Sequence, residues 1–329
     1  MKPTAITFAP LFIERVWGGR GLQKTFGKPL PAGALIGESW EVVDRAEEQS
    51  VVASGPLAGA ELHLLWSEER ERIFGARAAR AGPRFPILAK LLDARDTVSV
   101  QVHPSAQRAV EFGGQPKSEL WYLVDTDPGA HVFAGLRGGV TREAFSAALR
   151  AGEDVTAMLH RIDVAVGDAL FIPAGRVHAI GAGCRIVEIQ QNSDTTYRVF
   201  DFNRPGLDGR LRELHIPQSV ASIDFSDVEP APRPPGDGII TANAFFTVTR
   251  RTVGKEAERV TAEGECAITC VLTGEAICGE QRFRPGCFFL VPADAGGELR
   301  VTGPAQVLVA ELPEVAPSSS APAAALPGP

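Results

Sequence analysis

The sequence has no apolar run that approaches the roughly 20 residues a transmembrane helix needs. Its start, MKPTAITFAP, has one lysine and no long apolar core, so it does not resemble a secretory signal. Positive charge is not in excess either, because the formal net charge of −7 offers no basic field to nucleic acid or an anionic membrane. We therefore expect a cytoplasmic protein that binds neither nucleic acid nor a membrane.

Cysteine is scarce, and its pattern argues against two kinds of cross-link. The five cysteines are odd in number and include no Cys-x2-Cys pair. A disulfide framework is also unusual in a chain of 329 residues. We expect buried free thiols at positions 184, 266, 270, 278 and 287.

The chain is patterned mainly for β-structure. Short apolar or alternating runs are separated by Gly, Pro and Asp, as in all-β proteins. The expected strands cover residues 38–44, 87–94, 97–103, 119–124, 169–173 and 184–190. Helical periodicity appears at 60–80, 104–112 and 141–160, where Thr141 and Glu143 supply capping chemistry for the last segment. The fold class expected is therefore mainly β with added helical segments.

Composition and an internal repeat divide the chain. A proline-rich stretch at 229–238 cannot form a central strand or a helix and is typical of a linker. Beyond it, Gly286–Pro292 repeats the Gly-x5-Pro step of Gly167–Pro173, but no histidine follows the second copy. The low-complexity end is expected to be disordered. The predicted divisions are a metal-bearing catalytic domain (1–228), a linker (229–238), a degenerate second domain (239–312) and a tail (313–329).

Two histidines, a carboxylate and an amide indicate a metal site in the first domain. In GDALFIPAGRVHAIG (167–181) an apolar strand ends in a Pro/Gly turn, and His178 follows on the next extended piece. In TVSVQVHP (97–104) alternation puts Gln101 and His103 on one face of a strand. Glu119 follows among apolar neighbours, where burial without a partner would be costly. Such ligands suit Zn²⁺, and they also suit ferrous iron.

Two cations and a second carboxylate accompany these residues. Lys117 lies two positions before Glu119, so both side chains are expected to point the same way. Arg198 follows the strand that carries Glu188, and an arginine near a metal could hold a phosphate or stabilise a developing oxyanion. Glu188 is flanked by apolar residues that alternate away from it, so it could carry protons or simply pair with a cation.

These motifs resemble a known family. The step Gly-x5-Pro-x-Gly-x2-His is similar to the second signature of the cupin barrels. To about residue 312, the chain resembles the short bacterial form of the type I mannose-6-phosphate isomerases. The resemblance rests on RVWGG (15–19), GESWEV (37–42), FPILAKLLDARDTVSVQVHP (85–104), KSELWY (117–122), GDALFIPAGRVHAIG (167–181), VEIQQNSDTTYRVFDFNR (187–204) and RELHIPQS (212–219).

The resemblance implies a fold and a set of site residues. It implies two cupin (jelly-roll) β-barrels with added helical segments, the first carrying one Zn²⁺ per chain and the second degenerate. It implies zinc ligands at Gln101, His103, Glu119 and His178. It further implies a catalytic arginine at Arg198 and substrate-binding residues at Ser99, Lys117 and Glu188.

The implied reaction is the interconversion of mannose 6-phosphate and fructose 6-phosphate through a cis-enediol. Zinc would polarise the sugar carbonyl, and the base is either Glu188 or a metal-bound water. The partner expected is a small sugar phosphate, and the chain is expected to be a monomer or a small homo-oligomer. The alternatives are an isomerase of unphosphorylated mannose or related aldoses, an iron or manganese bicupin dioxygenase or decarboxylase, and a non-catalytic sugar-sensing cupin.

Overall fold

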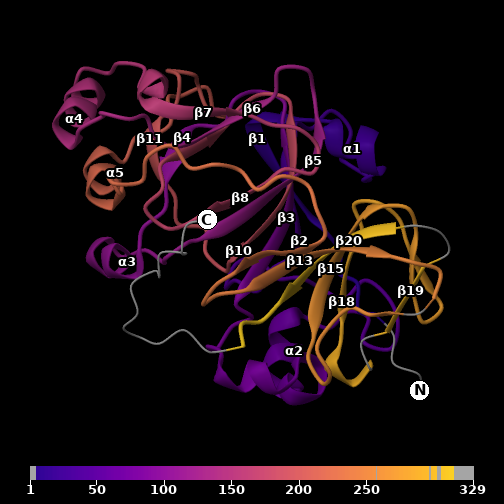
Figure 1. Cartoon of the computed structure of the whole chain (residues 1–329). Coiled ribbons are helices and arrows are strands. Elements are labelled where there is room, and N and C mark those ends of the chain that lie inside the picture. Colours follow the sequence, from indigo (N-terminus) through magenta and orange to yellow (C-terminus); the bar gives the residue numbers. More distant parts are fainter. Residues whose placement is uncertain (1–4, 257, 296–297, 302–304, 315–329) are drawn as a thin grey trace. The chain divides into compact units, whose positions relative to one another are not determined.

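The chain folds as two units, each assembled from segments that are distant in sequence (Figure 1). The computed structural model describes residues 5–256, 258–295, 298–301 and 305–314. Unit 1 comprises Met1–Ala9, Val43–Ile87 and Asp237–Pro329, and unit 2 comprises Pro10–Val42 and Leu88–Gly236. The predicted tail lies from residue 315 onward outside the described residues. The contiguous domain boundaries expected from the sequence stay a prediction.

Unit 2 contains two antiparallel sheets. The first has the strand order β1 (Leu11–Gly19), β2 (Ile36–Val42), β3 (Ile87–Ala94), β10 (Cys184–Gln191), β5 (Glu119–Thr126), β8 (Ala169–Ile172). The second has the order β11 (Tyr197–Phe200), β4 (Val100–Val102), β9 (His178–Ile180), β6 (His131–Leu136), β7 (Leu159–Asp163). Every residue of β2 and β3 is buried, which explains the nearly continuous apolar run of β3.

The core of unit 2 lies between these sheets. Trp121 and Ile186 of the first sheet share a buried apolar cluster with Val132 and Ile180 of the second. A separate cluster joins the other face of the second sheet to helices α4 (Arg142–Arg150) and α5 (Ile216–Ser222), which lie beside β11 and β4 in Figure 1. Unit 2 is therefore a β-sandwich with helices over one of its faces.

The segment predicted as a helix over 141–160 is α-helical only in its first half, and a 3-10 turn at Thr156–Met158 lies in the second. Thr141 caps α4 as expected, with its side chain accepting a hydrogen bond from the backbone N–H of Ala144. The helix then ends at Arg150, and Gly152 has a φ of +71°, the left-handed conformation that often terminates helices. The prediction was wrong beyond this point, where β7 begins at Leu159.

Unit 1 also pairs two antiparallel sheets. The first has the order β12 (Gly238–Ala242), β13 (Thr247–Val253), β20 (Ala305–Glu311), β15 (Ala267–Thr273), β18 (Phe288–Val291). The second has the order β14 (Glu258–Arg259), β19 (Glu298–Val301), β16 (Ala276–Cys278), β17 (Gln281–Phe283). Their shared core includes a stacked pair, Phe283 and Phe289, with ring centroids 3.9 Å apart.

The remaining helical elements are short. In unit 1, α2 (Leu62–Glu68) is followed by a π-helical turn (Arg70–Phe74) and a 3-10 helix (Ala76–Arg80), which together occupy the predicted helical segment 60–80. The others are α1 (Gly21–Phe26), α3 (Ala106–Phe112) and 3-10 turns at Thr156–Met158 and Ala293–Ala295. Among the described residues, no helix is both long enough and apolar enough to cross a membrane.

The internal repeat corresponds to the same local turn in both units. Gly167 and Gly286 have φ values of +96° and +80°, which favour glycine. Their backbone N–H groups donate to Leu123 O at 2.8 Å and to Val271 O at 2.9 Å. In each case the chain then forms a short strand, β8 or β18, against the strand that accepted the bond.

Two expectations are confirmed for the described residues, except that one cysteine, Cys287, is not buried. The described residues are mainly β, in antiparallel sheets with helical segments added. All five cysteines are free thiols, and four of them are buried while Cys287 is partly exposed.

Candidate metal centre and its cavity

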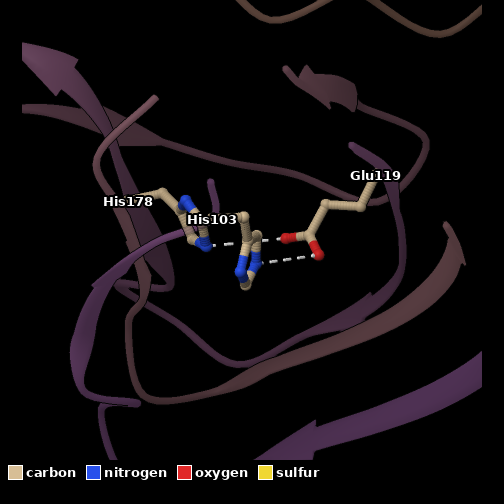
Figure 2. Close-up of side chains that lie close together, drawn as sticks. All are labelled: His103, Glu119 and His178. Carbon is tan, nitrogen blue, oxygen red and sulfur yellow. Dashed lines mark ion pairs between the residues drawn. The ribbon is translucent and has the colours of Figure 1, made fainter. Parts of the chain in front are cut away.

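Three buried side chains of unit 2 converge on one point (Figure 2). His103 directly follows β4, Glu119 begins β5 and His178 begins β9. Their nearest ligand atoms all lie within 4.8 Å of one another. His103 Nε2 is 3.3 Å from Glu119 Oε2, and His178 Nε2 is 3.6 Å from Glu119 Oε1. Each residue is at most 1 % exposed.

Backbone carbonyls fix which nitrogen of each ring carries the proton. His103 Nδ1 lies 3.0 Å from Thr195 O, and His178 Nδ1 lies 2.9 Å from Arg176 O. A carbonyl can only accept, so both Nδ1 atoms donate and both Nε2 atoms of the neutral rings present a lone pair towards Glu119. Neither Nε2 atom has a hydrogen-bond partner among the described residues. Two orphaned lone pairs beside a carboxylate fit a divalent cation.

Burial and charge keep these groups in their metal-binding protonation states. Burial lowers the pKa of His103 to about 3, and the charge of Lys117 contributes to the shift. Burial alone would raise the pKa of Glu119, but Lys117, with Nζ 2.8 Å from Oε2, and His103 hold it well below its usual value. A neutral imidazole and an ionised carboxylate are the forms that bind metal.

The predicted fourth ligand lies beside this cluster. Gln101 on β4 stands opposite His178 of β9 on one side and opposite Arg198 of β11 on the other. Residues directly opposite in antiparallel strands project from the same face. Ser99, Gln101 and His103 all line one cavity, as the alternation of this segment predicts. The role of Gln101 as a ligand stays a prediction.

The cavity has a volume of about 580 Å³ and is built entirely from unit 2. It brings together every sequence-predicted site residue except His178, which reaches it through its contact with Glu119. The predicted residues that line it are Ser99, Gln101, His103, Lys117, Glu119, Glu188 and Arg198.

An ion-pair chain that the sequence did not predict runs along one wall of this cavity. Arg15 Nε donates to Glu38 Oε1 at 2.7 Å, and Lys90 Nζ lies 3.2 Å from Glu38 Oε2 and 3.5 Å from Glu188 Oε1. Trp121 Nε1 completes the chain by donating to Glu188 Oε2 at 3.0 Å. One signal could have revealed it: a lysine inside the apolar strand ILAKLLDA must find a buried counter-charge.

Glu188 is a buried carboxyl group whose pKa is raised. Burial raises its pKa, the charge of Glu119 raises it further, and Lys117 and Lys90 offset these effects only in part. Glu188 therefore differs from Glu119, whose low pKa suits a ligand.

Arg198 is a cation without a carboxylate partner. Its Nη1 donates to the Glu213 carbonyl at 2.8 Å, and its buried Nε has no hydrogen-bond partner. Among the described residues, no carboxylate oxygen lies within 4.0 Å of its guanidinium nitrogens. Burial lowers the pKa of Arg198, and the nearby charge of Arg212 lowers it further. This part of the cavity wall is suited to an anion.

Comparison with known proteins agrees with this geometry. Residues 7–130 match the family model "Phosphomannose isomerase type I, catalytic domain". The chain is 34% identical over 325 residues to mannose-6-phosphate isomerase ManA from Bacillus subtilis, covering 95% of this chain and 100% of the relative.

Solved structures of mannose 6-phosphate isomerases also match this chain. The crystal structure of the mannose 6-phosphate isomerase from Bacillus subtilis matches with a TM-score of 0.82 and 30% identity, over 94% of this chain and 100% of that one. A zinc-bound mannose 6-phosphate isomerase matches with a TM-score of 0.71 over 94% of this chain and 100% of that one, and its 17% identity makes this a likeness of fold. With a relative 34% identical along nearly its whole length, this chain belongs to the type I phosphomannose isomerase family.

Proposed function

We propose that the chain interconverts mannose 6-phosphate and fructose 6-phosphate, using a zinc ion held by His103, Glu119 and His178 with Gln101 as a fourth ligand. The observation that carries the proposal is the convergence of two unpartnered Nε2 atoms and an ionised carboxylate beside a cavity of about 580 Å³. Histidine nitrogens and a carboxylate oxygen are ligands that zinc prefers, and the cavity beside them leaves room for a substrate. A bound zinc ion supplies Lewis acidity that polarises the sugar carbonyl.

The protein residues account for the carbon-to-carbon proton transfer of an aldose–ketose isomerisation. The reaction moves one proton between C1 and C2 and another between O1 and O2, through a cis-enediol. Glu188, with its raised pKa, is the group proposed to take the proton from one carbon and return it to the other. Trp121 and Lys90 fix its carboxylate by a hydrogen bond and an ion pair. Arg198 stabilises the negative charge that develops on the enediolate oxygen.

The distribution of charge favours a phosphorylated sugar over free mannose. Arg212 lines the cavity, and Asp201 engages its Nε and Nη2 but not its Nη1. Guanidinium groups bind phosphate by charge-assisted hydrogen bonds. Ser99 and Lys117 are proposed to contact the sugar phosphate as well.

The finer predictions about fold and setting belong to the same proposal. Each unit pairs two antiparallel sheets around an apolar core, which supports two cupin jelly-roll barrels. In unit 1 no histidine follows the Gly-x5-Pro turn at the position that His178 has in unit 2. We therefore propose one zinc ion per chain, bound in unit 2. A cytoplasmic location and a monomeric or small homo-oligomeric state are proposed with it.

A comparison of two substrates tests the proposed function. The rates at which the zinc-loaded protein isomerises mannose 6-phosphate and mannose are measured under identical conditions. We expect a kcat/KM at least about 100-fold higher for the phosphorylated sugar, because a desolvated arginine–phosphate contact is worth about 3 kcal/mol. Equal values for the two sugars would refute the assignment of substrate. Oxygen consumption coupled to product formation would instead indicate a dioxygenase.

A further inference from the structure

A buried carboxylate organises the arginines next to Arg198. Asp201 follows β11 directly and is 4 % exposed. Its Oδ2 accepts from Arg212 Nε at 2.6 Å, and its Oδ1 accepts from Arg212 Nη2 at 2.5 Å. The same Oδ1 accepts from Arg204 Nε at 3.2 Å and Nη2 at 3.1 Å. One carboxylate therefore binds two guanidinium groups.

The backbone after Asp201 is unusually shaped to allow this. Phe202 and Asn203 have φ values of +56° and +51°, a conformation that is rare for a bulky residue such as phenylalanine. The reversal lets the Arg204 N–H donate to Asp201 O at 3.2 Å. The Phe202 ring packs edge-on against Phe200, with centroids 5.2 Å apart, which holds the corner in place. Phe202 and Asn203 thus lie in a strained corner between Asp201 and the arginine that follows it, Arg204.

The chain then returns so that Arg212 reaches the cavity. Between β11 and α5 (Figure 1) it forms a narrow loop, in which Gly206 N–H donates to Arg210 O at 2.6 Å and Pro205 bridges to Leu211. Arg198 ties down the far end of this loop by donating from Nη1 to Glu213 O at 2.8 Å. Arg212 is thus held in two ways: Asp201 binds its side chain, and Arg198 binds the backbone carbonyl of the next residue, Glu213.

The geometry leaves one edge of the Arg212 guanidinium available. Asp201 engages Nε and Nη2, so Nη1 is the nitrogen that it does not engage. Arg212 and Arg198 both line the cavity. We infer that Asp201 is a positioning residue, which holds Arg212 in place at the cavity to bind the phosphate of the substrate. This inference rests on the proposed function for the identity of that substrate.

Two simpler roles for Asp201 make different predictions. If it served only as a counter-charge, its removal would make the arginine cluster more positive and tighten the binding of an anion. If it served only the stability of the loop, its removal would lower the unfolding midpoint without changing the preference for a phosphorylated ligand. A positioning role instead predicts that removal of Asp201 weakens the binding of an anion. It also predicts that the preference for a phosphorylated ligand falls, which a role in stability alone does not.

The test measures binding without turnover. Mannitol 1-phosphate carries a phosphate but has no carbonyl to isomerise, and mannitol is its unphosphorylated match. Dissociation constants for both are measured by calorimetry on the full-length, zinc-loaded protein. For Asp201→Asn we expect the Kd of mannitol 1-phosphate to rise about tenfold, since a bidentate charge-assisted contact is lost, while the Kd of mannitol stays unchanged. An unchanged or lowered Kd for mannitol 1-phosphate would overturn the inference.

A double-mutant cycle and two further variants complete the experiment. Arg212→Gln should raise the same Kd, and adding Asp201→Asn to it should cause little further change, because both remove one interaction. Full additivity would contradict the positioning role. Asp201→Glu keeps the charge but moves the carboxylate by one methylene, so a raised Kd supports the inference and a wild-type Kd overturns it, even if Asp201→Asn fails to fold. Asp44→Asn is the matched control.

The control variant separates loss of stability from loss of phosphate binding, and failure of the proposed function can be distinguished from failure of the inference. Asp44 is a fully buried aspartate of unit 1 that accepts from Arg84 Nη1 at 2.7 Å and does not line the cavity. Its replacement should lower the unfolding midpoint and leave both Kd values unchanged. If the wild type binds mannitol 1-phosphate but does not isomerise mannose 6-phosphate, the proposed function fails. The role of Asp201 is still decided by the Kd values.

Discussion

Replacement of Glu38 by glutamine should destabilise unit 2 strongly although it removes no side-chain volume. The Glu38 carboxylate accepts from Arg15 Nε and Trp40 Nε1, each at 2.7 Å, and lies 3.2 Å from Lys90 Nζ. The Lys90 side chain is only 4 % exposed, and without Glu38 its remaining carboxylate is Glu188 at 3.5 Å. Breaking a buried pair by removing one partner costs about 3–5 kcal/mol.

The lower end of that range, about 3 kcal/mol, is the value expected here, because Lys90 keeps one of its two carboxylates. Urea unfolding followed by tryptophan fluorescence is a suitable assay, since Trp17, Trp40 and Trp121 belong to unit 2 and only Trp66 to unit 1. The loss is large against the roughly 5–15 kcal/mol by which most domains are stable.

The matched control is the same substitution in an exposed ion pair of unit 2. Glu111 pairs with Arg108 on α3, and their side chains are 48 % and 39 % exposed. Glu111→Gln should cost less than about 1 kcal/mol, because exposed pairs are well solvated when apart. If Glu38→Gln and Glu111→Gln shifted the unfolding midpoint equally, the account of the buried ion-pair chain would be refuted.

Three further predictions concern pH, metal and the repeated turn. Folding lowers the pKa of Glu38 from 4.5, so its contribution to stability is present above that pH and is lost as pH falls. The stability difference between wild type and Glu38→Gln should therefore shrink below pH 4.5. A difference that stays constant would contradict this role of the ionised Glu38. His178→Ala should lose zinc and activity together, whereas Arg198→Ala should keep zinc, measured by elemental analysis, and lose turnover. Gly167→Ala should destabilise by about 1–3 kcal/mol through its positive φ, while Gly82→Ala, whose new Cβ meets no atom within 4 Å, should be nearly neutral in the same urea titration.

Much of the site could be predicted because its residues lie in local patterns. Alternation along 97–103 predicted that these side chains share one face, and Ser99, Gln101 and His103 do line one cavity. The Pro/Gly turn predicted His178 on the next extended piece, which is β9, and the structure pairs His178 with Gln101. The two-residue spacing of Lys117 and Glu119 brought their charged groups within 2.8 Å. Each of these inferences needed only the two-residue period of a strand or one short turn.

The parts that could not be predicted depend on long-range pairing or on unusual backbone geometry. The ion-pair chain joins Arg15, Glu38 and Lys90 from three strands, and only the register of the sheet brings them together. Asp201 binds Arg212 across a stretch of chain that begins at Phe202, whose positive φ the sequence does not signal for a phenylalanine. The residues after Gly152 keep an apolar spacing compatible with a helix, but the left-handed glycine ends it.

The central claim, a zinc-dependent mannose-6-phosphate isomerase, is tested most directly by a coupled assay of mannose 6-phosphate turnover before chelation, after chelation and after addition of Zn²⁺. The account predicts that activity disappears with the metal and returns as one equivalent of zinc binds at His103, Glu119 and His178. Full turnover of mannose 6-phosphate by the metal-free protein, or none by the zinc-loaded protein, would contradict it.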